Sequence, residues 1–279
     1  MALKLMYITN RPEIAQIAET AGVDRIFIDL ENIGKSERQG GMDTVQSHHT
    51  LDDVKIISNV ITTAELLVRV NPIHNRTEEY VSSEEEISTA IKNGADIVML
   101  PFFKTVEEVK RFLTAVNGRA KTMLLLETPE AVEIVDDLLC LEGIDSIHIG
   151  LNDLSLGYGM KFMFELLTDG TVERLCAKFC KKNIPYGFGG IASLGKGLVP
   201  AEMIIKEHYR LGSTCAILSR SFCDVDKIND IGEISSIFVK GMRKIRVFEA
   251  ECEKHIGDLI NNKFELEKIV KMIVGGELK

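Results

Sequence analysis

Short runs of apolar residues alternate with longer amphipathic segments along the whole chain. The runs are rich in Val, Ile and Leu and show little alternation with polar residues, a pattern typical of parallel strands that are buried on both faces. Eight strands are predicted, at residues 4–9, 25–30, 66–70, 96–100, 122–127, 146–150, 185–189 and 215–219.

Helices are predicted between these strands. Val106, Val109, Phe112 and Val116, for example, recur at helical spacing and form one apolar stripe. Proline near the start of several segments and glycine just beyond the end are the expected helix boundaries. The predicted helices cover residues 11–21, 51–63, 83–93, 105–117, 129–141, 165–182 and 200–211, and two further helical patterns follow at 228–254 and 258–274.

Eight consecutive strand–helix units predict an α/β fold, the (β/α)8 TIM barrel. A doubly wound open sheet is the alternative, but no GxGxxG motif follows the first strand. No linker-like or low-complexity segment interrupts the pattern, so residues 1–279 are predicted to form a single domain. Residues 228–279 are predicted to be a C-terminal helical extension that covers a barrel end or docks on a second subunit.

Composition narrows the class of protein. Lys and Arg number 33 against 42 Asp and Glu, which gives a formal net charge of −9, so neither nucleic acid nor an anionic membrane is an expected partner. No apolar run reaches the roughly 18 residues that a membrane span requires. The apolar segment at the start of the sequence is also too short for a secretory signal. The six cysteines form no CxxC pair. We therefore expect a cytoplasmic protein.

Two predicted strands end close to carboxylates. Glu127 ends the strand at 122–127, and Asp153 follows the strand at 146–150. The carboxyl ends of neighbouring parallel strands meet at one end of a barrel, which is where barrel enzymes build their active sites. A carboxylate pair with room for water suits Mg²⁺ or Mn²⁺. The alternative is that both are ordinary strand-end acids that cap a helix or form a salt bridge.

Other polar side chains are predicted at the same barrel end. Asp29 and Glu31 come from the second strand and Arg69 from the third, and Arg69 is expected to form an ion pair with one of these acids, to bind a substrate oxygen, or both. His48 and His49 lie in the connection at residues 32–50, where one of them is a candidate general base and a solvated loop pair is the alternative. The other long connections at this end are 71–82 and 151–164, and Arg220 follows the last strand.

A glycine-rich segment, Gly190 to Gly197, follows the seventh strand. It is close to a phosphate loop, but Gly197 stands where Ser or Thr would be required to ligate Mg²⁺. Glycine-rich turns at this position of a barrel often receive phosphate or carboxylate groups. A modest role in anion binding is therefore left open.

The sequence also resembles a known family. The segments Leu-Leu-Glu-Thr-Pro-Glu-Ala-Val around Glu127 and Gly-Ile-Asp-Ser-Ile-His-Ile-Gly-Leu-Asn-Asp-Leu-Ser-Leu-Gly around Asp153 are similar to those of the metal-dependent class II pyruvate aldolase and citrate lyase beta-subunit-like family. That family belongs to the phosphoenolpyruvate/pyruvate barrel superfamily. The resemblance extends over roughly residues 5–220 and includes 27–31, 68–72 and 99–103.

The resemblance implies an enzyme that cleaves or forms carbon–carbon bonds. Glu127 and Asp153 would bind Mg²⁺ or Mn²⁺, and Arg69 would stabilise the enolate. The substrate would be a small 2-keto acid or related carboxylate that reacts through a metal-bound pyruvate enolate. The substrate carboxylate would bind at the turn formed by Gly150, Leu151, Asn152 and Asp153. Asp29 would assist the catalytic base. The family resemblance also implies a homo-oligomer, a hexamer or a dimer.

One position departs from the family pattern. Asn32 follows Glu31 where the aldolases have a histidine that serves as base, so His48 or His49 is expected to replace it if turnover occurs. The alternative is a catalytically altered barrel that binds a carboxylated or phosphorylated ligand without turnover. A coenzyme A ester lyase is a third possibility, but it would require a basic groove, and no basic cluster near the barrel end stands out in the sequence.

Overall fold

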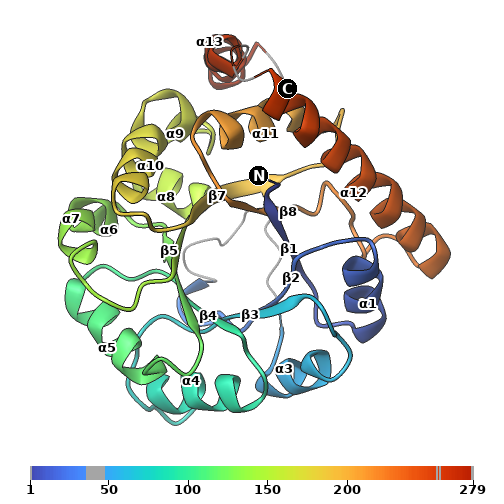
Figure 1. The fold of residues 1–279 in the computed structure, drawn as a ribbon. Helices are drawn as coiled ribbons and strands as arrows, with labels where there is room; N and C mark the ends of the chain where they lie inside the picture. The colour runs from blue at the N-terminus through green and yellow to red at the C-terminus, as the bar shows by residue number, and fades with distance from the viewer. Residues whose placement is uncertain (1, 36–47, 256, 258, 278–279) are drawn as a thin grey trace.

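The computed structural model describes residues 2–35, 48–255, 257 and 259–277, and at its centre lies a closed barrel of eight parallel strands. Each strand pairs with the next one along the chain, and β8 pairs with β1 to close the ring. The strands are β1 (Lys4–Ile8), β2 (Arg25–Asp29), β3 (Glu65–Arg69), β4 (Ile97–Leu100), β5 (Lys121–Leu126), β6 (Ser146–Ile149), β7 (Tyr186–Ile191) and β8 (Cys215–Leu218). The predicted TIM barrel is confirmed, and Figure 1 shows its helices around the ring.

Helices cover the outside of the barrel. Capping boxes begin three of them, at Thr50, Ser82 and Thr105, because each of these side chains accepts a bond from a backbone amide three residues later. The helices are α1 (Pro12–Thr20), α3 (Leu51–Ser58), α4 (Ser83–Lys92), α5 (Val106–Val116), α6 (Pro129–Glu133), α7 (Val135–Leu138), α8 (Leu151–Gly157), α9 (Glu165–Thr168), α10 (Thr171–Lys181), α11 (Ala201–Arg210), α12 (Ile231–Lys254) and α13 (Leu259–Val274).

Three predicted helices are shorter or divided in the structure. The helix predicted at 51–63 ends at Ser58, because the amides of residues 62–64 donate to the Glu19 carboxylate instead of to helical carbonyls. The helix predicted at 165–182 is divided into α9 and α10 by Gly170, whose φ of 85° is left-handed. The helix predicted at 129–141 is divided into α6 and α7 at Ile134, which leaves helical geometry.

The connection predicted at 151–164 begins with a helix instead. The Asn, Asp, Ser and Gly residues of this segment are typical of turns, which explains the wrong prediction. In the structure α8 forms because Leu151 and Leu154, three residues apart, are both buried in the core. Tertiary packing therefore overrides the local turn preference.

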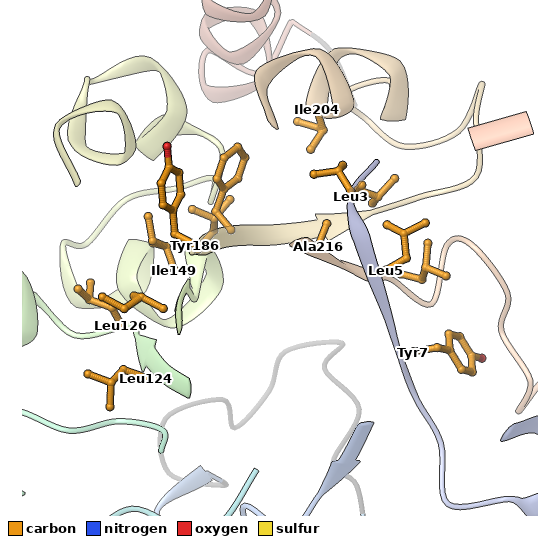
Figure 2. Packing of buried hydrophobic residues seen from close by; sticks show 14 of the residues in the cluster. Leu3, Leu5, Tyr7, Leu124, Leu126, Ile149, Tyr186, Ile204 and Ala216 are labelled. Carbon is orange, nitrogen blue, oxygen red and sulfur yellow. The ribbon is translucent and has the colours of Figure 1, made fainter. Parts of the chain in front are cut away.

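The apolar core has two layers. Side chains that point outward from the strands form one large cluster with apolar side chains of the helices, and Figure 2 shows Leu5, Leu124 and Leu126 among its members. A smaller cluster fills the interior of the barrel, and its members are Met6, Phe27, Leu67, Ile97, Met99, Met123, Leu125 and Cys215. Described side chains thus fill the interior of the barrel, as is usual for this fold.

The C-terminal segment completes the barrel's helical layer. α12 contacts α1 and α11, and α13 contacts α11 and α9. Ile234, Phe238 and Met242 of α12 are fully buried in the chain's own core, so these three residues are not available to a second subunit. A homo-oligomer remains a prediction. Among the residues that the structure describes, no helix is long and apolar enough to cross a membrane.

The contact between β7 and β8 yields a test of barrel closure. A Cβ atom at Gly187 would lie 2.2 Å from the Cys215 backbone oxygen, whereas at Gly190 the nearest atom would be at an ordinary 3.5 Å. We expect Gly187→Ala to lower the free energy of unfolding by about 1–3 kcal/mol, because both backbones must shift. Urea denaturation measures the change, with Gly190→Ala as the matched control. Equal effects of the two substitutions would contradict this account.

Candidate active site

A cavity of about 640 Å³ opens where the barrel strands end, and we call it the mouth cavity. Active sites of barrel enzymes lie at this end. The mouth cavity brings together five of the predicted site residues, Asp29, His48, His49, Arg69 and Asn152. Its other lining residues are Tyr7, Ile8, Thr9, Asn10, Arg11, Lys35, Met163, Ile217, Leu218, Ser219, Arg220, Cys223, Asp224, Val225 and Asp226.

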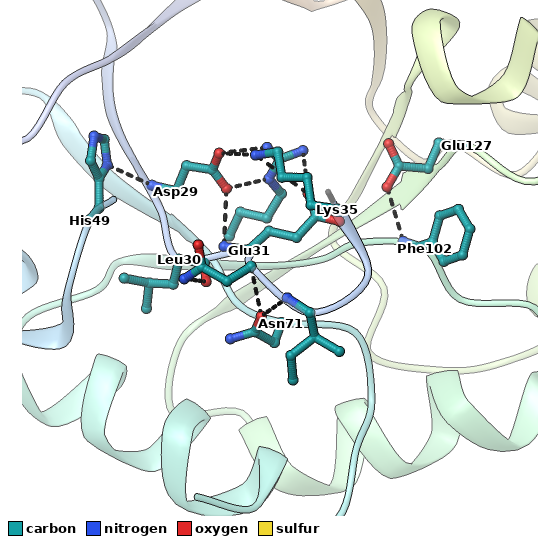
Figure 3. A network of polar contacts seen from close by, with 11 residues as sticks. Asp29, Leu30, Glu31, Lys35, His49, Asn71, Phe102 and Glu127 are labelled. Atoms are coloured by element: carbon teal, nitrogen blue, oxygen red, sulfur yellow. Dashed lines mark hydrogen bonds and ion pairs between the residues drawn. The ribbon is translucent and has the colours of Figure 1, made fainter. Parts of the chain in front are cut away.

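Asp29 lies between the cations Arg69 and Lys35 at the wall of this cavity, and Figure 3 shows the network of contacts around it. The β2–β3 register places Asp29 opposite Arg69. Arg69 donates from Nε and Nη2 to the two carboxylate oxygens, at 2.7 Å each, and Lys35 Nζ lies 2.6 Å from Oδ2. Glu31 Oε2 lies 3.2 Å from Arg69 Nη1. Of the alternatives for Arg69, the ion pair with both acids is present.

These contacts fix the charges of the cluster. Burial on its own would raise the pKa of Asp29, but Arg69 and Lys35 outweigh it and hold the pKa well below its usual range. Burial likewise lowers the pKa of Arg69, yet Asp29, Glu31 and Glu127 raise it above its ordinary value. Asp29 is therefore ionised at neutral pH, and it serves to orient Arg69 and Lys35 rather than to store a proton.

His49 is tied to the same cluster through the backbone. Its Nδ1 accepts a hydrogen bond from the Asp29 amide at 3.0 Å. Burial lowers the pKa of His49, so the ring is neutral at pH 7 and carries its hydrogen on Nε2. In this tautomer His49 can donate to a ligand, but it can accept a proton only by giving up the bond to Asp29. His48 is exposed and also lines the mouth cavity.

Glu127 and Asp153 line a neighbouring cavity of about 610 Å³, which we call the acidic cavity. Both residues are buried, with 3% and 8% of their surface exposed. The Phe102 amide donates to Glu127 Oε1 at 3.0 Å (Figure 3). The cavity is also lined by Phe102, Lys104, Thr128, Pro129, Glu130, Glu133, Leu156 and Gly157.

Gly150 lets the chain pass close to Glu127. A Cβ atom at Gly150 would lie 2.7 Å from Glu127 Cβ and 2.8 Å from its Oε2, so a larger residue would displace the carboxylate. The Gly150 amide donates to the Leu126 carbonyl. At the start of α8, Asn152 then lines the mouth cavity and Asp153 the acidic cavity, and the buried Leu151 side chain anchors the helix.

The acidic residues suit a hard divalent cation. Mg²⁺ is usually held by one or two carboxylates and keeps several water ligands. In the described part of the chain no group of three or more His, Cys, Asp or Glu residues could enclose a metal ion. Glu127 and Asp153 therefore fit a cation that completes its coordination with water and substrate oxygens, and they do not fit a closed structural site.

The sequence did not identify every residue of the site. Lys35 bonds Asp29, but in the sequence it is one of several charged residues of a loop. No basic cluster near this barrel end stands out in the sequence, but the structure brings one together. A third cavity, of about 810 Å³, is lined by Lys196, Arg220, Lys227, Lys240 and Lys244. These residues come from segments far apart along the chain, so the sequence contains no local run of charge that would indicate the cluster.

A protein-family model for the HpcH/HpaI aldolase/citrate lyase family matches residues 4–163, more than half of the chain. The chain belongs to this family. Aldolase or lyase activity in general is therefore supported, and the resemblance seen in the sequence is confirmed. The matched region contains Asp29, Arg69, Glu127 and Asp153, and it ends before the residues that line the third cavity.

Solved structures share the fold at low sequence identity. The HpcH/HpaI aldolase from Desulfitobacterium hafniense DCB-2 has a TM-score of 0.61 and 15% identity, over 88% of this chain and 93% of that one. Macrophomate synthase has a TM-score of 0.53 and 16% identity, over 78% of this chain and 77% of that one. At such identities the likeness shows the fold alone. No curated protein matches the chain.

The buried cluster around Asp29 gives a test of stability. Asp29→Asn leaves Arg69 and Lys35 without their shared carboxylate, so we expect the free energy of unfolding to fall by about 3–5 kcal/mol at pH 7. Because folding lowers the pKa of Asp29, its contribution is fully present above the ordinary carboxyl pKa of about 4, begins to shrink as the pH falls below that value, and is lost completely only below the lowered pKa of the folded state.

Urea denaturation between pH 7 and pH 3 measures this difference between wild type and variant. The control is Glu107→Gln, which removes an exposed ion pair with Lys110 and should cost at most about 1 kcal/mol. An Asp29→Asn effect as small as that of the control would show that the cluster does not stabilise the fold. A large effect that does not shrink at low pH would show that the charge of Asp29 is not its source.

Proposed function

We propose that the protein is a divalent-metal-dependent carbon–carbon lyase of the aldolase type, acting on a 2-keto acid or a related small carboxylate. The observation that carries this proposal is the pair of buried carboxylates, Glu127 and Asp153, in one cavity beside the Asp29–Arg69 ion pair. Membership in the aldolase/citrate lyase family supports the reaction class. The metal and the substrate class are our inference from the side chains.

Glu127 and Asp153 would hold Mg²⁺ or Mn²⁺. Such a cation, when bound, supplies a Lewis acid that stabilises negative charge developing on the keto oxygen of the substrate. The Phe102 amide keeps Glu127 in place, and α8 fixes Asp153 at its first turn. Positioning by rigid elements suits a ligand set that must hold its geometry during turnover.

Arg69 would provide a second source of positive charge. Its guanidinium is held by Asp29 and Glu31, lines the mouth cavity, and lies within the electrostatic influence of Glu127. A donor fixed in this way does not need to reorganise when negative charge develops on the substrate oxygen. Asp29 and Lys35 are then positioning residues, which act on the substrate only through Arg69.

One of the two histidines would accept the proton that cleavage releases. Cleavage of a 4-hydroxy-2-keto acid removes the hydroxyl proton and breaks the bond between the third and fourth carbons. The aldehyde then leaves, and the electron pair stays on the pyruvate unit, whose methyl carbon later takes up a proton. We infer that His48 accepts the hydroxyl proton, because His49 already uses Nδ1 to accept from Asp29.

The metal ligands can be tested without knowing the natural substrate. Oxaloacetate decarboxylation forms the same pyruvate enolate, and we expect it to require Mg²⁺ or Mn²⁺ above the background rate of the metal alone. Glu127→Gln and Asp153→Asn should each lower kcat by about 10²-fold or more, because charge stabilisation in the transition state is lost. Mn²⁺ binding, followed by electron paramagnetic resonance, should weaken in both variants.

Glu130→Gln is the matched control. Glu130 lines the same cavity but is half-exposed and pairs with Lys104, so its variant should keep the wild-type rate. Mn²⁺ binding without decarboxylation in the wild type would favour a barrel that holds a carboxylated or phosphorylated ligand without turnover. Decarboxylation that persists in both ligand variants would refute the assigned metal site.

The roles of the two histidines give a test based on pH. We expect His48→Ala to abolish the acidic limb of the kcat profile for cleavage of 4-hydroxy-2-oxopentanoate and to lower the rate by about 10²-fold or more. His49→Ala should lower the rate but keep that limb, because it loses a hydrogen-bond donor and not the base. If the limb disappears only in His49→Ala, the roles are reversed. If it persists in both variants, neither histidine is the base.

A further inference from the structure

Phe102, in the segment after β4, has an unusual backbone conformation. Its φ of 47° lies in the left-handed region, which residues with a Cβ atom avoid. Among residues 2–35, 48–255, 257 and 259–277, the other residues besides glycine with a positive φ are Asn117 and Asn183. These two lie at the ends of α5 and α10, where a left-handed asparagine is common. Neither residue type nor position explains the conformation of Phe102 in the same way.

The residues on both sides of Phe102 are held in place. Leu100 ends β4, and Pro101 and Phe103 are buried. The Phe103 carbonyl accepts a hydrogen bond from Thr128 Oγ1 at 2.8 Å, and Thr128 is the N-cap of α6. A change in the Phe102 backbone would therefore move either the end of β4 or the start of α6.

Packing of the Phe102 ring does not account for the conformation. The ring is half-buried, lines the acidic cavity and is not one of the buried side chains of the core. Its neighbour Lys104 is exposed, with Nζ 5.3 Å from the ring centroid. A half-exposed ring beside an exposed lysine gives little burial to offset the cost of a left-handed backbone.

The conformation instead directs the Phe102 amide at Glu127. The amide donates to Oε1 at 3.0 Å (Figure 3). Near the other oxygen the chain passes so closely that a Cβ atom at Gly150 would lie 2.8 Å from Oε2. The carboxylate is thus confined between the Phe102 amide and the Gly150 backbone. Strained backbone is concentrated at functional sites, where it holds a group in the required orientation.

We propose that Phe102 is the positioning residue of Glu127 and that its left-handed backbone sets the affinity of the protein for Mg²⁺ or Mn²⁺. The inference rests on the proposed function, because that proposal makes Glu127 a metal ligand. It adds that the ligand is oriented by a strained amide before the cation binds. A carboxylate oriented in advance loses less conformational freedom on binding.

The residue type at position 102 tests this without turnover. Mn²⁺ binding in the absence of keto acid, followed by electron paramagnetic resonance, should weaken by about 10–100-fold in Phe102→Val, because a β-branched residue resists the left-handed region and the amide turns away. Phe102→Gly should bind Mn²⁺ as the wild type does, because glycine adopts this conformation freely. If the ring were responsible, Phe102→Gly would bind at least as weakly as Phe102→Val, and that result would overturn the proposal.

The strain itself is measured in the metal-free protein. In EDTA, Phe102→Gly should unfold at a higher urea concentration than Phe102→Ala, because both lack the ring and only alanine retains the cost of a Cβ atom at positive φ. Glycine is otherwise the less stabilising of the two residues. An equal or lower midpoint for Phe102→Gly would show that no strain is stored at this position.

Asn117→Val is the matched control. Asn117 has a φ of 48°, but it lies at the end of α5 and does not line the acidic cavity. The control should lower the urea midpoint, as Phe102→Val does, and keep the Mn²⁺ affinity of the wild type. Equal loss of affinity in the two valine variants would assign the effect to general destabilisation and overturn the proposal, and so would wild-type affinity in Phe102→Val.

Failure of this inference is distinct from failure of the proposed function. If Mn²⁺ affinity depends on position 102 as expected but the wild type does not decarboxylate oxaloacetate, the lyase assignment is refuted and the role of Phe102 is supported. If the wild type shows metal-dependent decarboxylation but Phe102→Val keeps its Mn²⁺ affinity, the lyase assignment stands and the role of Phe102 is refuted. Absence of Mn²⁺ binding to the wild type would overturn both.

Discussion

The buried ion pair between Asp29 and Arg69 is the interaction on which the candidate site depends. The parallel register of β2 and β3 sets the two residues opposite each other, and burial makes each of them costly unless the other is present. Lys35 and Glu31 join the pair, so four charges compensate one another at one point of the barrel mouth. The guanidinium is thereby fixed between the mouth cavity and the acidic residues beside it.

The barrel determines which groups can meet this cluster. Its eight parallel strands bring side chains that are far apart along the chain to one end, and two glycines allow the close approaches that this end requires. Gly187 permits β7 to approach Cys215 on β8, and Gly150 permits the start of α8 to approach Glu127. The fold thus supplies rigidity at the points where a small displacement would move a carboxylate or a cation.

The sequence predicted the elements of the barrel better than the contents of its cavities. Strands appeared as continuous apolar runs, and Glu127 and Asp153 were visible because strand ends are regular positions. The α8 helix was missed because its core contacts override turn-like residues. The bond between Lys35 and Asp29 and the cluster of cations in the third cavity could not be predicted, because the sequence alone does not show which groups a lysine lies beside. Lys196 and Lys244 line one cavity although they lie far apart along the chain.

The three cavities differ in the charged residues that line them, and the family model covers only some of these residues. Residues that carry the proposed bond cleavage, Asp29, Arg69, Glu127 and Asp153, lie within the region matched by the family model, residues 4–163. The lysines that line the third cavity all follow that region. The family match therefore covers the groups of the proposed reaction and does not extend to the segment from Ser193 to Lys244.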